Sequence, residues 1–135
     1  MIRIFAATLL TSATLLLGTT SAAAADRVQA GQWETTMTVG SAKPVVTKYC
    51  ITAGEARAMN GDLATLRKYL EESTAANTKG RCSVKNVALN GNKTVVTIAC
   101  GKTEVVGTTT YHGNHYESTS SNGSSVTGKR IGNCP

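Results

Sequence analysis

Residues 31–39 alternate between apolar and polar side chains with a period of two. Trp33, Thr35, Met37 and Val39 fall on one face, and polar side chains separate them. This alternation is typical of a strand with one buried face. We therefore expect these four side chains to point towards the core.

A turn over residues 40–44 and a second strand over residues 45–50 follow. The spacing then changes from that of strands to that of helices. Thr52 and Glu55 have the spacing of a capping box, in which a hydroxyl and a carboxylate satisfy the first free N–H groups of a helix. A short helix is predicted over residues 53–59.

Asp62 can cap a second short helix, which has an apolar face. The side chains on this face are Leu63, Leu66, Tyr69 and Leu70. We expect the face to pack on the sheet, because the domain has little other apolar surface to bury. Binding of a partner through this face is the alternative. Residues 75–80 are predicted to be a loop.

The remaining sequence predicts a meander of strands joined by short turns. Residues 82–89 and 93–100 flank Asn90-Gly91-Asn92, a typical hairpin sequence. Later turns at Gly101-Lys102, Gly113-Asn114 and Asn122-Gly123 separate strands over 103–111 and 115–121 and a last short strand near Val126. The predicted fold is α+β but mostly β: an antiparallel meander sheet of six or seven strands in the order β-β-α-α-β-β-β-β, with two short helices.

The sequence contains four cysteines, Cys50, Cys82, Cys100 and Cys134. A three-residue hairpin loop places Leu89 opposite Lys93, and counting outward then places Cys82 opposite Cys100. A two-residue loop would send these cysteines to opposite faces. We therefore predict the disulfides Cys82–Cys100 and Cys50–Cys134. A zinc site or a redox pair is the alternative, but the chain has no Cys-x-x-Cys.

The N-terminus has the pattern of a cleaved signal peptide. Arg3 precedes an apolar run over residues 4–17, and small residues follow, with Ala23 and Ala25 at the positions that signal peptidase reads. A retained anchor helix is the alternative, but the run is short for a bilayer. Cleavage after Ala25 leaves one domain, 26–135, with no transmembrane segment. We expect it to be a periplasmic or secreted monomer.

The charge and composition of the mature chain narrow its function. Without Arg3 the chain has 13 basic and 8 acidic side chains, and an exported protein with scattered basic residues is not expected to bind nucleic acid. Phe5 is the only Phe and lies in the signal peptide, so the mature core is small. Disulfides are the expected source of additional stability.

The only two histidines flank the predicted turn at Gly113-Asn114. A two-residue turn would place His112 opposite His115, with Tyr111 paired to Tyr116 on the other face. Two imidazoles without a third ligand do not make a specific metal site, so no metal or cofactor is expected. The chain has no Gly-x-Ser-x-Gly motif and no evident carboxylate dyad, so we do not expect an enzyme.

Several motifs occur together along the mature chain. They are Gly31-Gln32-Trp33-Glu34, Tyr49-Cys50-Ile51-Thr52 before Glu55-Ala56, an Asn-Gly turn between Cys82 and Cys100, Tyr111-His112-Gly113-Asn114, and Gly132-Asn133-Cys134-Pro135. In this order they resemble a family of small exported proteins of Gram-negative bacteria, domain of unknown function 3617. The resemblance implies export and these cysteines, and it assigns no activity to any residue.

A looser likeness is to lipocalin-type barrels, which begin with Gly-x-Trp and set a basic residue of the last strand against that Trp. Trp33 and Arg130 could take these positions. Two hypotheses follow. The domain is a non-catalytic interaction module for an unknown envelope protein, or it is a carrier that encloses a small apolar ligand in a curved sheet or barrel.

Overall fold

Seven antiparallel strands form one sheet in the computed structural model, which describes residues 26–135. The strands are β1 Gly31–Val39, β2 Val45–Ile51, β3 Cys82–Asn90, β4 Lys93–Cys100, β5 Thr103–Tyr111, β6 His115–Ser120 and β7 Ser124–Gly132. Helices α1 (Ala53–Asn60) and α2 (Leu63–Thr78) follow β2. The predicted mostly-β class is confirmed, and the predicted signal peptide lies outside the described residues.

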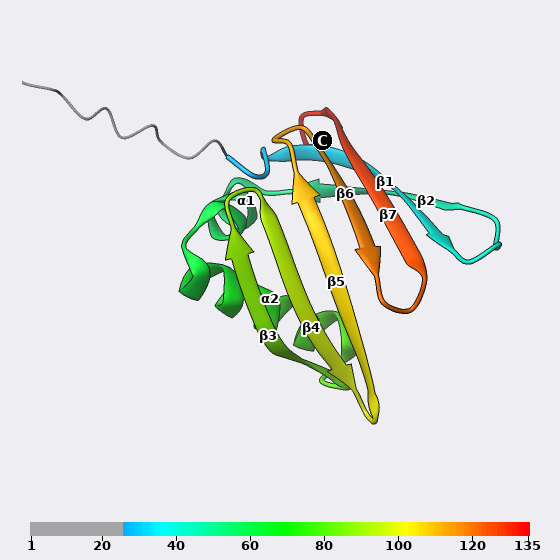
Figure 1. The fold of residues 1–135 in the computed structure, drawn as a ribbon. Helices are drawn as coiled ribbons and strands as arrows, with labels where there is room; N and C mark the ends of the chain where they lie inside the picture. Colours follow the sequence, from blue (N-terminus) through cyan, green and yellow to red (C-terminus); the bar gives the residue numbers. More distant parts are fainter. Residues whose placement is uncertain (1–25) are drawn as a thin grey trace, which may run out of the picture.

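The strand order in the sheet is β2-β1-β7-β6-β5-β4-β3. Strand β1 therefore pairs with β7, which joins the beginning of the domain to its end, while β2 and β3 are the two edges. Figure 1 shows both helices on one side of the sheet, with α2 behind β3 and β4. We call this side, which carries Trp33, the inner face, and the opposite side the outer face.

Two groups of buried side chains form the core on the inner face. Trp33 is fully buried together with Val28, Ile51 and Ala56 under α1. Leu66 of α2 packs against Val84 and Val87 of β3 and forms a second cluster of buried residues, distinct from the one around Trp33. Burial of each Val, Leu or Ile side chain in these groups contributes about 1.5–3 kcal/mol, so the two helices pack against the sheet at two places.

Both predicted helix starts are confirmed. The Thr52 hydroxyl accepts a hydrogen bond from the Glu55 N–H (3.2 Å), and the Glu55 carboxylate accepts one from the Thr52 N–H (2.8 Å). The Asp62 carboxylate accepts one from the Thr65 N–H (2.8 Å). Among the described residues, neither helix is long and apolar enough to cross a membrane.

The predicted end of α2 is wrong, because the helix continues into the expected loop and reaches Thr78. Ala75 and Ala76 are strong helix formers, and the helix stops only where Lys79 adopts a left-handed conformation (φ 53°). The Gly80 N–H then donates to the Ala75 carbonyl (2.8 Å). The helix has 16 residues and is not short. Leu63, expected on its packed face, is 46% exposed.

The hairpin loop is also shorter than predicted. Asn90 lies opposite Lys93, so the loop has two residues, and Gly91 supplies the positive φ (58°) that its first position needs. Cys82 nevertheless lies opposite Cys100, because the register shifts between Val84 and Asn86. This β-bulge adds one residue to β3 and returns both cysteines to one face.

The last strand was predicted as a short segment near Val126, but β7 has nine residues and lies in the middle of the sheet. The C-terminal half of β1 also differs from expectation. Met37 and Val39 were expected to point into the core, but they are 44% and 49% exposed. Both helices lie at the other end of the sheet (Figure 1), so these inward positions have no cover.

Both predicted disulfides, Cys50–Cys134 and Cys82–Cys100, are present. The way in which the start of the domain is held was not predicted, however. The Asn60 side chain accepts a hydrogen bond from the Val28 N–H (2.9 Å) and donates one to the Val28 carbonyl (2.7 Å). The Arg27 guanidinium donates to the Met59 carbonyl (2.9 Å). Residues 27–28 are therefore a buried part of the fold.

Candidate functional site

A hollow on the inner face lies between α2 and strands β4 to β6. It has a volume of about 230 Å3, and we call it the inner groove. Its walls are mainly apolar. The lining residues are Leu66, Leu70, Thr94, Val96, Ile98, Val105, Gly107, Thr109, Tyr111 and Ser120.

Gly107 leaves room in this groove. It lies in the middle of β5, where it pairs with Val96 and Ser120. A Cβ atom added there would meet only ordinary contacts, the nearest being the Ser120 Oγ at 3.8 Å. Glycine in a strand weakens the strand and often marks close approach by another group. The backbone here does not need glycine, so the missing side chain creates space.

Hydroxyl groups line one part of the otherwise apolar groove. The Thr109 hydroxyl donates to the Ser118 hydroxyl (2.9 Å), and Thr94 is only 3% exposed. Burial raises the pKa of the Tyr111 hydroxyl above its ordinary value, and hydrogen bonding with Thr94 and Thr109 partly offsets this rise. The groove thus combines apolar walls with neutral groups that can hydrogen-bond a polar end of a ligand.

An aromatic cluster adjoins the groove. The rings of Trp33 and Tyr116 lie 5.7 Å apart between centroids, and those of Tyr111 and Tyr116 lie 5.9 Å apart. The hydroxyl oxygens of Tyr49 and Tyr116 are 3.2 Å apart. Only Tyr111 of this cluster lines the groove. Trp33 is buried behind it, with its Nε1–H bonded to the Gln29 carbonyl (3.0 Å).

The structure places Trp33 directly opposite Arg130 in the β1–β7 register. The Arg130 guanidinium donates to the Ala30 carbonyl (2.8 Å) and to the Asn133 side chain (2.8 Å). It also occupies space that a side chain on Gly31 would need. These contacts hold the start of β1 against the C-terminal residues. Trp33 and Arg130 therefore have a structural role where β1 begins and β7 ends.

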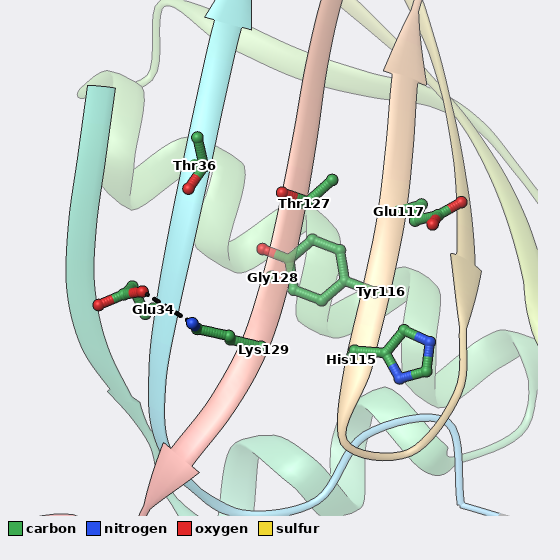
Figure 2. Close-up of a pocket in the computed structure, with 8 residues that line it drawn as sticks. All are labelled: Glu34, Thr36, His115, Tyr116, Glu117, Thr127, Gly128 and Lys129. Carbon is green, nitrogen blue, oxygen red and sulfur yellow. Dashed lines mark ion pairs between the residues drawn. The ribbon is translucent and has the colours of Figure 1, made fainter. Parts of the chain in front are cut away.

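The outer face carries a second, polar hollow of about 300 Å3. Figure 2 shows its lining, Glu34, Thr36, His115, Tyr116, Glu117, Thr127, Gly128 and Lys129. The Glu34 carboxylate lies 3.4 Å from the Lys129 ammonium and 3.8 Å from that of Lys48. Glu34 is therefore neutralised by lysines on both neighbouring strands, and the short Thr36 and Thr127 side chains leave the space above them open.

The two histidines lie together as predicted, but as a stack. Their ring centroids are 4.4 Å apart and the rings are inclined by 13°. Asn114 Oδ1 lies 2.9 Å from Nδ1 of His115. Over residues 26–135, no group of three His, Cys, Asp or Glu side chains could hold a metal ion. His112 and His115 therefore have no third ligand there, and His115 borders the outer-face hollow.

A family model described as protein of unknown function (DUF3617) matches residues 28–134, nearly all of the described chain. The chain belongs to this family. The resemblance expected from the sequence motifs is confirmed. Comparisons with curated proteins and with solved structures find no match.

Sequence reasoning missed the inner groove in this family member. One signal was available, because Gly107 interrupts a run of β-branched residues in β5. The rest of the lining comes from α2 and from the consecutive strands β4, β5 and β6. The position of α2 relative to these strands closes the groove, and local sequence patterns could not reveal that position.

Proposed function

We propose that this domain is an exported, non-catalytic binding module that holds a small, mainly apolar molecule in the inner groove. The observation that carries this proposal is the open space above Gly107 between α2 and the sheet. A strand residue that need not be glycine costs stability when it is glycine. Retaining the space is understandable if a ligand occupies it.

The chemistry of the lining supports the ligand class. Leu66, Leu70 and Ile98 supply apolar contact, while Thr109 and Ser120 supply hydroxyls. The groove is smaller than the 300–1,000 Å3 or so of sites for drug-sized molecules, so it suits a short acyl chain or one to two rings. All four cysteines are in disulfides, which removes thiol chemistry and supports an oxidising compartment.

The proposal can be tested with a neutral two-ring fluorophore, 1-naphthylamine, and the mature protein. We expect saturable binding with enhanced emission. Gly107→Val should weaken binding about tenfold or more, because its side chain fills the groove. Val106→Leu is the matched control, since it adds apolar volume to the neighbouring residue on the outer face, and it should bind as the wild type does.

Thermal unfolding should establish that both variants remain folded. Native mass spectrometry of the protein from its own periplasm should in addition detect a bound small molecule in the wild type and less of it in Gly107→Val. Equal binding of the fluorophore by the wild type and by Gly107→Val, or no binding by either, would sink the proposal. Trp33 is a poor probe because it does not line the groove.

A second candidate is an interaction with an envelope protein through the outer face. The polar hollow around Glu34 and Lys129 (Figure 2) favours this candidate, since both helices lie on the opposite side of the sheet (Figure 1). A photo-crosslinking residue at Thr119 on this face should capture one partner in native envelopes. The same residue at Thr109 on the inner face should not. Equal capture from both positions would argue against a docking face.

A further inference from the structure

The free edge of β2 is open to a further strand. Five consecutive residues of this strand, 45–49, are exposed, including Val45 (53%), Val46 (57%) and Tyr49 (40%). Within residues 26–135, β2 pairs only with β1. An exposed apolar edge strand presents unpaired N–H and C=O groups and is a template for pairing with another chain.

The opposite edge of the sheet is protected in the ways that commonly prevent such pairing. Strand β3 has a bulge between Val84 and Asn86, and the residue in the bulge is the exposed Lys85. Helix α2 also packs against this strand (Figure 1). Strand β2, in contrast, pairs with β1 without a register shift. The two edges differ, and β2 is the one suited to pairing.

A second copy of β2 complements the first in one antiparallel register. A two-fold axis perpendicular to the sheet keeps inner residues opposite inner residues, and we place this axis at Thr47, an inner-face residue. It places Val45 opposite Tyr49 of the second copy, a β-branched–aromatic pair of the kind that stabilises sheets. On the outer face it places Val46 opposite Lys48 of the second copy. An axis at Lys48 would instead oppose two like charges.

We propose that two copies of this chain pair through β2 about Thr47, which extends the sheet across the dimer. Both inner faces then lie on the same side. The exposed side chain of Val45, the neighbour of Met37 in the β1–β2 register, then gains Tyr49 of the second copy as a cross-strand neighbour.

Charge changes at Val46 test this register directly. Val46→Lys sets two like-charge pairs against Lys48 in the dimer, whereas Val46→Glu sets two opposite-charge pairs against it. Sedimentation equilibrium from about 1 µM to about 1 mM should show dimerisation of the wild type, roughly tenfold weaker for Val46→Lys and roughly threefold or more tighter for Val46→Glu. Added salt should reduce both differences.

Val106→Lys and Val106→Glu are the matched controls, because Val106 is an exposed outer-face residue (39%) on β5, away from the edge. They change the net charge equally and should leave the dimerisation constant unchanged. The proposal is overturned if the wild type and Val46→Glu remain monomers up to the highest concentration. It is equally overturned if a dimer forms that responds alike to both Val46 variants.

Discussion

The ring of Tyr116 occupies the space that any side chain on Gly128 would need. A Cβ atom added to Gly128 would collide with three atoms of this ring. The two residues are cross-strand partners of β6 and β7, and the ring continues from Gly128 to a contact with the buried Trp33. Gly128 is therefore required by packing, in contrast to Gly107.

This contrast predicts the effects of two alanine substitutions. Gly128→Ala should lower the free energy of unfolding by about 1–3 kcal/mol, because the Tyr116 ring must leave Trp33. Gly107→Ala should change it by less than about 1 kcal/mol, or raise it slightly. Urea denaturation followed by Trp33 fluorescence measures both. Equal losses in the two variants would contradict this packing argument.

The two disulfides should contribute unequally to stability. They close segments of 84 and 18 residues for Cys50–Cys134 and Cys82–Cys100, respectively. The loop-entropy model assigns about 4.5 kcal/mol to the longer segment and about 3 kcal/mol to the shorter. Paired Cys→Ser variants in urea denaturation should show this order. Because one loop lies inside the other, the loss in the four-Ser variant should differ from the sum, and a larger loss from the short loop would contradict the model.

The hydrogen bonds of Asn60 to Val28 should also be important for stability. Asn60→Ala leaves a buried N–H and a buried carbonyl without partners, which costs about 1–3 kcal/mol. Asn60→Asp keeps the acceptor for the Val28 N–H but sets an oxygen against the Val28 carbonyl. Both variants should unfold at lower urea, and their N-terminal residues should become sensitive to aminopeptidase. Asn90→Ala, at the exposed end of β3, is the control and should match the wild type.

The tyrosines predict a loss of stability at high pH. Burial raises the pKa of Tyr116 far above its ordinary value of 10.0, and the nearby Tyr49 hydroxyl raises it further. The unfolded chain therefore releases this proton at a lower pH than the folded chain does. The stabilisation is fully present below about pH 10 and is lost as the pH rises further.

Tyrosinate absorbance and circular dichroism measure this prediction together. The absorbance of the buried tyrosines should appear only as the protein unfolds. Tyr116→Phe should make stability fall less steeply above pH 10, because one proton fewer is released on unfolding. Tyr49→Phe should have a smaller effect on this slope, since Tyr49 is 40% exposed. Ionisation of all tyrosines well before unfolding would contradict the expectation.

The pairing of Cys82 with Cys100 was predicted correctly from the local sequence, although the loop length used to derive it was wrong. The alternation around the Asn-Gly turn predicted that Cys82 lies opposite Cys100. The loop proved one residue shorter, and a bulge at Lys85 compensated for it. No local pattern marks this bulge. The bulge has a physical reason, because it places both cysteines and Val84 on the inner face, where α2 packs.

Features that depend on neighbours along the chain could be predicted from the residues alone. These are the strand alternation from Trp33, the caps at Thr52 and Asp62, the turn at Gly113-Asn114 and the family. The folded arrangement determines which faces are covered, because cover depends on where α1 and α2 lie on the sheet. It therefore decided that Gly107 opens into a groove, that Val28 is buried and that the edge of β2 is free. Burial is a property of the assembled layers, and no segment carries it alone.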